Sequence, residues 1–246
     1  MKSLVIGAGQ VGSALAAVLS EKYEVKIIDK GEAFDEEFDI LHICFPFFVK
    51  YPEWFKQEVF RYKDKYKPKY IVIHSTVPIG TTQSFHSKNI VHSPIRGKHP
   101  NLIPSIKTFV KYVGADDIGI GDIIARYFRE SGINVELIEN SKNTEFAKIA
   151  STTKYGWDIV FMKEMKRICD QEKLNFHVVY TDFTKTYNQG YDELEGGEFL
   201  KFHRPVLDYQ SGGIGGHCVV QNCDLYSDFV TNLVKERNKI YEEDSI

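Results

Sequence analysis

Residues 212–218 read GGIGGHC and place four glycines just ahead of His217 and Cys218. A buried structural cysteine needs no such loop, whereas a cysteine that reacts with a substrate needs a backbone that lets the substrate approach. The thiolate is a nucleophile, so Cys218 can add to an electrophilic carbon and form a covalent intermediate. Cys44 and Cys169 differ, because they lie in the apolar stretches LHICFPF and MKRICDQ. These two are predicted to be unreactive core thiols.

A second glycine pattern lies near the first residue, where VIGAGQVG has the spacing G-x-G-x-x-G. It follows a predicted strand and opens a predicted helix, which is the context that a dinucleotide-binding turn requires. Gly7 would form the tight turn, Gly9 would let the backbone approach a pyrophosphate, and Gly12 would let the helix pack against the strand. The pyrophosphate would lie at the start of the helix, where backbone N–H groups point outward.

The second predicted strand ends at Asp29, and Lys30 follows it. A carboxylate at this point accepts hydrogen bonds from both ribose hydroxyls and repels a 2′-phosphate. The pattern therefore predicts NAD rather than NADP as the cofactor.

Short apolar segments alternate with amphipathic ones over the first part of the chain. Repeated strand–helix–strand units imply a parallel sheet with helices on both faces, so we expect an α/β fold with a Rossmann-type doubly wound parallel sheet. Strands are predicted at 2–7, 23–29, 39–47, 69–76, 89–94, 109–115 and 133–139, and helices at 10–22, 51–64 and 119–131.

The pattern changes at residue 141. Residues 141–174 carry apolar side chains at helical spacing without strand alternation, which predicts one helix far longer than the average of about 11–12 residues. Further helices are predicted at 176–190 and 219–240. We expect an NAD-binding domain over 1–140 and an all-α domain over 141–246. The long central helix would be the spine of the second domain and the interface of a homodimer.

Composition narrows the possible partners. The net charge is −3, so no strong positive field favours nucleic acid or an anionic membrane. The apolar run at residues 3–6 breaks into glycines at once, unlike a secretion signal, and no stretch approaches the roughly 18 apolar residues of a membrane span. We expect a cytoplasmic protein that acts on a small molecule and binds neither nucleic acid nor membrane. The cysteines also lack the paired spacing of a zinc site.

Three segments far apart in the chain carry a resemblance. IHSTVPIGTT (73–82) ends a strand, EFAKIASTTKYGWDIVFMKEMKRICD (145–170) lies in the long helix, and GGIGGHC (212–218) holds the cysteine. In order and content they resemble three features of the UDP-glucose/GDP-mannose dehydrogenase family: its S-T-V-P-x-G-T strand end, its central helix starting with E-x-x-K, and its glycine-rich loop with the catalytic cysteine. The G-G-H-C form is most similar to the branch that acts on UDP-N-acetyl-hexosamines.

The resemblance implies a reaction and roles for particular residues. Members of that family oxidise a sugar C6 alcohol twice with NAD, through a thiohemiacetal and a thioester on the cysteine. By match, Cys218 is the nucleophile, Lys148 stabilises the developing alkoxide and lowers the thiol pKa, and Thr76 positions a water. Thr152 and Asn222 match two further positions of the active site. The expected cofactor contacts are Gly7, Gly9, Gln10, Val11, Gly12, Asp29, Lys30, Pro46, Ser75 and Thr76.

Several family positions are replaced in this chain. The glutamate of the family's S-P-E segment is Ile95, its helix asparagine is Thr152, and the aspartate after the cysteine is Asn222. An amide cannot act as a carboxylate base. The sequence also stops after the expected connecting helix, so we expect it to lack the family's third, UDP-binding domain. The substrate would then be a nucleotide sugar held with help from elsewhere, or a smaller molecule.

Two alternatives stay open beside the two-step dehydrogenase. One is a protein that binds NAD but has lost the chemistry, which the replacements favour. The other is a single-step dehydrogenase of the hydroxyacid type, which shares a lysine on a helix and needs no cysteine. His42, His74 and His92 each fall near a strand end, where open α/β sheets bind ligands. We expect them to be structural histidines.

Overall fold

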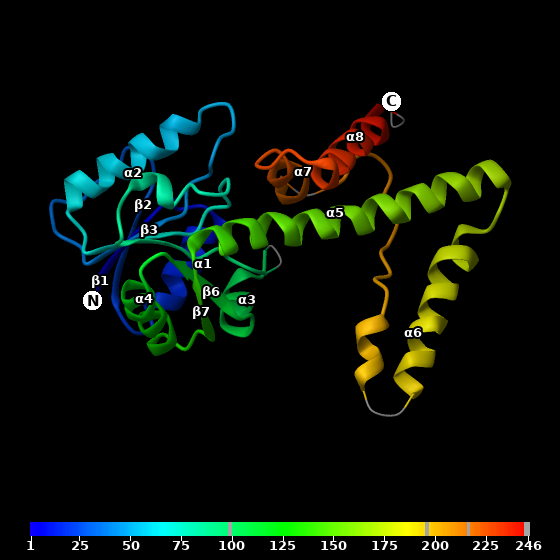
Figure 1. Ribbon diagram of the computed structural model, residues 1–246, viewed down its shortest axis with the longest axis horizontal. Helices are drawn as coiled ribbons and strands as arrows, with labels where there is room; N and C mark the ends of the chain where they lie inside the picture. Colours follow the sequence, from blue (N-terminus) through cyan, green and yellow to red (C-terminus); the bar gives the residue numbers. More distant parts are fainter. Residues whose placement is uncertain (98–99, 195–196, 216, 244–246) are drawn as a thin grey trace. The chain divides into compact units, whose positions relative to one another are not determined.

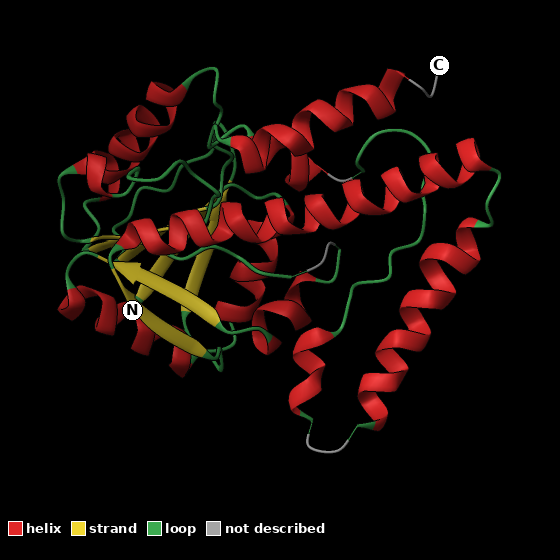
Figure 2. Cartoon of the chain, turned by 45° about the vertical axis from the view of Figure 1, so that its right-hand side comes forward, coloured by secondary structure: helices red, strands yellow, loops and turns green. Residues whose placement is uncertain are grey.

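The computed structural model describes residues 1–97, 100–194, 197–215 and 217–243. The chain forms two compact units, Met1–Ile149 and Ala150–Ile246, and each is described by itself. The division falls inside helix α5 (Ser141–Glu172), which runs as one 32-residue helix (Figure 2). The predicted long helix is therefore confirmed.

The first unit is built on one seven-stranded sheet in the order β2-β1-β3-β4-β5-β6-β7. Neighbouring strands are parallel except β5 and β6, which are antiparallel, so the sheet departs from the expected parallel arrangement at this one pair. A parallel neighbour needs a crossover that carries the chain back to the opposite edge of the sheet. The described part of the segment from β5 to β6 includes one short helix, α3, and β6 starts at the edge where β5 ends. The strands are β1 (Lys2–Ile6), β2 (Glu24–Ile28), β3 (Ile40–Ile43), β4 (Tyr70–Ile73), β5 (Ile90–His92), β6 (Lys111–Ala115) and β7 (Val135–Glu139).

Helices cover both faces of this sheet (Figure 1). One apolar core packs α1, α3 and α4 against the sheet, and a second core packs α2 against the other face. This two-faced burial explains why the strands read as continuous apolar runs rather than alternating ones. The helices are α1 (Gln10–Leu19), α2 (Pro52–Tyr66), α3 (Leu102–Thr108) and α4 (Ile118–Glu130), with a 3₁₀ turn η1 (Gln83–Phe85) after β4.

The second unit consists of the rest of α5 and shorter helices. A π-helical turn η2 (His177–Asp182) leads into α6 (Phe183–Glu193), and a 3₁₀ helix η3 (Glu198–Phe202), α7 (His217–Cys223) and α8 (Phe229–Glu243) follow. Its core joins α5, α7 and α8 through Val160, Ile214, Val219, Cys223, Val234 and Tyr241. Within the described ranges, no helix is both long and apolar enough to cross a membrane.

The fold class expected from the sequence is confirmed: a Rossmann-type α/β sheet is followed by an all-α region built on a long central helix. The single helix predicted at 219–240 was wrong, because α7 and α8 are separate. Asp228 Oδ1 accepts from the Val230 N–H, and Thr231 Oγ1 accepts from the Asp228 N–H, so this pair starts a new helix. The strand predicted at 39–47 ends at Ile43, and helix α3 was not predicted.

Candidate active site

The glycine turn between β1 and α1 has the geometry that the G-x-G-x-x-G spacing requires. Gly7 has a φ of +106°, and a Cβ on it would lie 2.9 Å from the Phe45 nitrogen. A Cβ on Gly12 would lie 1.9 Å from the Gly7 oxygen, so helix and turn pack too closely for a side chain. Gly9 has open space beside it and caps α1 without a side-chain hydrogen bond. The residues present therefore fit a dinucleotide: a tight turn, an open approach and an uncapped helix start.

The end of β2 presents an exposed carboxylate. The Ile28 carbonyl accepts a hydrogen bond from the Gly7 N–H at 2.9 Å. Asp29, the next residue along the chain, therefore lies beside the glycine turn. Asp29 is exposed, as is Lys30, and the carboxylate accepts a hydrogen bond from the Lys30 N–H at 2.9 Å. An exposed carboxylate at this point has the chemistry that a ribose contact requires.

The ends of β3 and β4 are tied to each other. Ser75 Oγ donates to the Phe45 carbonyl at 2.5 Å, directly before the exposed Pro46. Since Phe45 also borders Gly7, the expected cofactor contacts on three loops lie at one edge of the sheet. Thr76 is half-buried at the same edge, one residue beyond Ser75.

The first turns of α5 fasten these loops from the other side. Glu145 is fully buried; its carboxylate accepts from the Gly80 N–H at 2.5 Å and from the Thr82 N–H and hydroxyl at 2.8 and 2.7 Å. Burial raises the pKa of this carboxyl group, and the three donors act against that shift. One turn on, Lys148 Nζ donates to the Ile95 carbonyl at 2.9 Å and is half-buried. The lysine expected to act in catalysis therefore lies at the carboxyl end of β5.

His92 adds a second fastening at this place. Its Nε2 lies 3.2 Å from the Ser75 carbonyl and its Nδ1 lies 2.8 Å from Thr144 Oγ1. The carbonyl is an acceptor only, so Nε2 carries the proton and Nδ1 accepts from the threonine. Burial lowers the pKa of His92 to about 3, which keeps it neutral. His92 is thus a structural histidine, as expected from the sequence.

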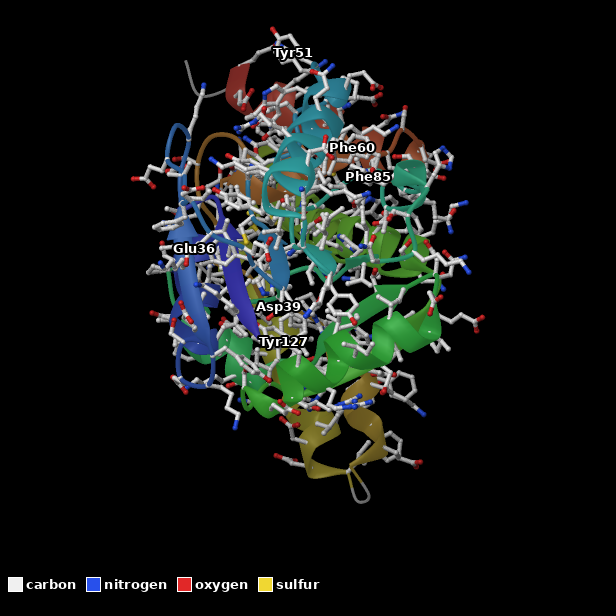
Figure 3. All side chains as sticks on the ribbon, turned by 90° about the vertical axis from the view of Figure 1, so that its left-hand side faces the viewer. Glu36, Asp39, Tyr51, Phe60, Phe85 and Tyr127 are labelled. Atoms are coloured by element: carbon white, nitrogen blue, oxygen red, sulfur yellow. The ribbon has the colours of Figure 1, made fainter. Side chains whose placement is uncertain are left out.

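The other two histidines belong to a buried row on the opposite face, the α4 face, of the sheet. His74 Nδ1 lies 2.7 Å from the Ser93 carbonyl, so it carries the proton, and His74 Nε2 accepts from His42 Nδ1 at 3.0 Å. His42 Nε2 in turn lies 3.3 Å from the Tyr127 hydroxyl, which lies 2.7 Å from Ser3 Oγ. Tyr127 comes from α4 (Figure 3). Burial lowers the pKa of His42 to about 3, so the row is uncharged up to this point.

Lys111 ends the row and is the cation that the sequence analysis missed. Its Nζ donates to the Ser93 carbonyl at 2.9 Å and lies 3.2 Å from His74 Nδ1. Lys111 is 4% exposed, and burial lowers its pKa to about 7. No ion pair to Lys111 is found among the described residues. A neutral amine fits this contact, because it can accept from the His74 N–H while donating to the carbonyl.

The second unit holds the remaining predicted residues. Asn222 Nδ2 donates to Thr152 Oγ1 at 3.2 Å, so the two replaced family positions are in contact. Cys218 is exposed on α7, whereas Cys223, one turn on, is fully buried 3.7 Å from Thr153 Oγ1. Burial raises the pKa of Cys223. Of the two thiols on α7, only Cys218 is accessible.

The glycine loop before Cys218 is held by two side chains that the sequence analysis did not select. Lys163 Nζ donates to the Gln210 and Gly212 carbonyls at 2.5 and 2.7 Å, and Asn238 Oδ1 accepts from the Ile214 N–H at 2.5 Å. Lys163 is only 5% exposed, and burial lowers its pKa. A lysine inside the apolar stripe of a predicted helix was the available signal. Gly215 has open space around it, and Gly216 lies outside the described residues.

The two expected core thiols have different surroundings. Cys169 is buried, as predicted, whereas Cys44 is half-buried beside the glycine turn. Burial raises the pKa of Cys44 to about 12, so it too is unreactive.

Comparisons with known proteins place the fold among dehydrogenases. No protein-family model matches the sequence, and no curated protein matches it significantly. Among solved structures, it is similar to UDP-D-ManNAc dehydrogenase from Pyrococcus horikoshii (TM-score 0.77, 16% identity), over 97% of this chain and 68% of that one. It is similar to UDP-glucose dehydrogenase from Pyrobaculum islandicum (TM-score 0.68, 16% identity), over 99% and 68%. It is also similar to 3-hydroxyisobutyrate dehydrogenase from Mycobacterium tuberculosis (TM-score 0.71, 11% identity), over 100% and 95%. At these identities the likeness establishes the fold alone, a Rossmann-type α/β sheet followed by a helical region.

Proposed function

We propose that the protein is an NAD-dependent oxidoreductase, related to the UDP-sugar 6-dehydrogenases, that oxidises the primary alcohol of a sugar-like substrate through Cys218. The observation that carries the proposal is the exposed Cys218 thiol on α7, which follows a glycine loop held by Lys163 and Asn238. The same helix carries Asn222, which is paired with Thr152. An inert cysteine would need no such anchoring. The fold it shares with dehydrogenases supports the same reading.

The glycine turn would hold the cofactor. Gly9 leaves room for the pyrophosphate at the start of α1, and Asp29 would accept from the ribose hydroxyls. Pro46, Ser75 and Thr76 would border the cofactor at the ends of β3 and β4. When bound, NAD supplies the hydride acceptor for each oxidation step.

The chemical roles follow from the residue types. Lys148 would stabilise the alkoxide as the alcohol loses its proton. The alkoxide carbon would then lose a hydride to the oxidised cofactor, and the Cys218 thiolate would attack the resulting aldehyde. The thiohemiacetal oxygen then gives an alkoxide that can expel a second hydride, leaving a thioester. Thr76 would position the water that hydrolyses it, releasing the carboxylate and the free thiol. Thr152 and Asn222 can hydrogen-bond that water but cannot take its proton as a carboxylate would.

The test is NADH formation from NAD with a panel of UDP-sugars, sugar acids and hydroxy acids. We expect turnover by the wild type with two NADH per substrate, and loss of the second NADH in Cys218→Ala. Cys169→Ala is the control, because it removes a buried thiol of the same unit. One NADH per substrate that does not depend on Cys218 would replace the proposal with the single-step dehydrogenase.

A specific observation favours the single-step dehydrogenase. The chain matches 95% of the length of 3-hydroxyisobutyrate dehydrogenase, against 68% of the UDP-sugar enzymes. Binding of NAD without turnover on any substrate would instead favour the protein that has lost its chemistry. Absence of NAD binding would exclude all three.

We propose further that 141–246 forms a helical domain that pairs two copies of the chain. Large apolar side chains lie exposed on α5, η2 and α6, among them Phe161 (58%), Val178 (52%) and Phe183 (71%). An apolar surface of this kind favours association. Sedimentation should give twice the mass of one chain, and Phe161→Lys with Phe183→Lys should give the monomer.

A further inference from the structure

The segment after β5 gathers basic side chains. The Ser93 carbonyl accepts from Lys111 Nζ, and the Ile95 carbonyl accepts from Lys148 Nζ, each at 2.9 Å. Arg96 is the next residue. Lys111 from β6 and Lys148 from α5 therefore bond to carbonyls within three residues of Arg96. Lys111 is buried, whereas Lys148 and Arg96 lie at the edge of the sheet where open α/β folds bind ligands.

Arg96 is held in one orientation although it is exposed. Its guanidinium carbon lies 5.9 Å from the ring centre of Phe109 and 5.3 Å from that of Tyr112, and its Nη1 donates to the Val110 carbonyl at 3.3 Å. Two rings and one carbonyl thus fix the plane of the group and leave most of its N–H donors unused. A fixed, planar set of donors loses little freedom when it binds an anion.

No carboxylate of the residues that the structure describes pairs with Arg96. Among the described residues it forms no ion pair, whereas Arg61, Arg126, Arg167 and Arg237 each have a glutamate or aspartate partner. Arg129 and Arg204 also form no ion pair within the described ranges, but Arg129 is bonded to the Val135 carbonyl on β7, and Arg204 stacks on Tyr187.

The neighbours of Arg96 add to the positive potential. After burial, the largest cause, the charge of Lys148 also lowers the pKa of Lys111, and both lysines lower that of His92. Ile95 stands where the resembling family has a glutamate, and its side chain packs into the core with Leu102 and Ile106. The position that would bring a carboxylate to this loop is therefore apolar.

We propose that Arg96 binds an anionic group of the substrate, a carboxylate or a phosphate, close to the alcohol that is oxidised. Arginine pairs with either oxyanion through two parallel N–H donors, which fixes the orientation of the molecule as well as its position. Lys148 of α5, which bonds to the carbonyl of Ile95 next to Arg96, remains at the reacting alcohol. The substrate class is thus an acidic alcohol: a sugar acid, a hydroxy acid or a sugar phosphate.

The inference rests on the proposed function for the reaction, but anion binding can be measured without turnover. We would titrate the NAD-saturated protein with malonate, inorganic phosphate and UDP by calorimetry, with glycerol as the neutral probe. Arg96→Gln should weaken the affinity for the anion at least tenfold. The affinity of Arg96→Lys should lie between those of wild type and Arg96→Gln, because lysine keeps the charge but loses the planar pair of donors. Arg126→Gln removes an exposed arginine of α4 and should change nothing.

A second pair of variants tests the charge itself. Ile95→Glu puts a carboxylate beside Arg96 and should weaken the affinity for the anion at least tenfold. Ile95→Gln introduces an uncharged side chain of the same size as glutamate and should weaken that affinity less. Melting temperatures separate these effects from unfolding, since Ile95 is buried. Arg96→Gln alters an exposed side chain and stays informative if both Ile95 variants unfold.

The outcomes divide cleanly. Malonate or phosphate binding that Arg96→Gln weakens supports the inference and names the anion; UDP binding alone, lost in Arg96→Gln, supports it with a nucleotide diphosphate as the source. No binding of any probe, or equal binding by wild type and Arg96→Gln, overturns it. Arg96-dependent binding without any NADH formation would leave this inference standing and remove the proposed function.

Discussion

Two groups of basic side chains lie on the strand ends of the first unit, and their surroundings are opposite. His42, His74 and Lys111 lie under α4, hydrogen-bonded to one another and closed off from water. Lys148 and Arg96 lie at the edge of the sheet, half-buried and exposed. The inner group is driven toward neutrality by burial, while the outer group keeps basic side chains where a ligand can reach them.

The difference arises from which way each residue points along its strand. His42 and Lys111 share the strand face of Ile40 and Val113, whose core includes α4. Because successive side chains in a strand alternate between faces, a shift of one residue would move either group into the α2 core. Lys148 instead comes from α5, and Arg96 lies past the end of β5. A basic residue near a strand end is therefore a candidate for chemistry only when its side chain lies past the sheet and not in the core.

The largest expected effect separates the outer group from the inner one. Lys148→Met should lower the rate of NADH formation about 10²–10⁴-fold, because a charged donor at the alkoxide is lost, with little change in the melting temperature. Initial rates at saturating NAD measure it.

The matched control is Lys154→Met on the same helix, which removes a surface ion pair with Asp158 and should leave the rate unchanged. Lys148→Arg should recover part of the rate, since the charge returns. A rate for Lys148→Met within threefold of wild type would show that Lys148 takes no part in the reaction.

The next effect concerns stability and belongs to the inner group. Lys111 has an ordinary pKa of 10.5 when unfolded and about 7 when folded. Between these values the unfolded chain binds one more proton, so the free energy of unfolding contributed by Lys111 rises with pH, by about 1.4 kcal/mol per unit. Below pH 7 the full cost of burying the cation is present. The groups facing it are His74, the Ser93 carbonyl, the Phe128 ring, Cys44 and Lys148.

Lys111→Met should therefore stabilise the protein most below pH 7, and its advantage over wild type should shrink as the pH rises from about 7 to 9. Urea unfolding at intervals of half a pH unit measures the difference. Lys163→Met gives a comparison, because Lys163 is also buried but holds two carbonyls of the glycine loop. If the difference in the free energy of unfolding between wild type and Lys111→Met does not change with pH, Lys111 stays charged in the folded protein.

Local patterns predicted what depends on local structure. The glycine turn at Gly7–Gly12 and the length of α5 were predictable because each is set by residues close in sequence. Lys111 and Lys163 were not, since a lysine is normally exposed and only the pairing of distant segments encloses these two. The antiparallel β6 was missed for the same reason: its direction depends on where the chain returns to the sheet.

The candidate site divides in the same way. Residue types and spacing selected Cys218 and Asp29, and the resemblance to the UDP-glucose/GDP-mannose dehydrogenase family added Lys148. The residues that hold them in place were not selected: Glu145 holds the loop after β4, and Asn238 holds the glycine loop. Glu145 stood in the sequence as part of E-x-x-K, but its three donors come from residues about sixty positions away, which no local pattern reveals.

The smallest effect tests whether the inner row acts as a connected set. Tyr127 and Tyr23 stack with ring centres 4.4 Å apart, yet the Tyr127 hydroxyl joins Ser3 and His42 inside the protein, while the Tyr23 hydroxyl donates to the exposed Glu130 at 2.5 Å. Tyr127→Phe leaves Ser3 Oγ and His42 Nε2 without this partner and should cost about 1–3 kcal/mol in the free energy of unfolding. Tyr23→Phe keeps the stacking and should cost less than about 1 kcal/mol, because water can solvate Glu130. The ¹⁵N shifts of His42 should also change in Tyr127→Phe and stay fixed in Tyr23→Phe. If both variants lose the same free energy of unfolding and the ¹⁵N shifts of His42 do not change, the buried residues do not act as a connected row. Burial alone would then account for the contrast with the outer group.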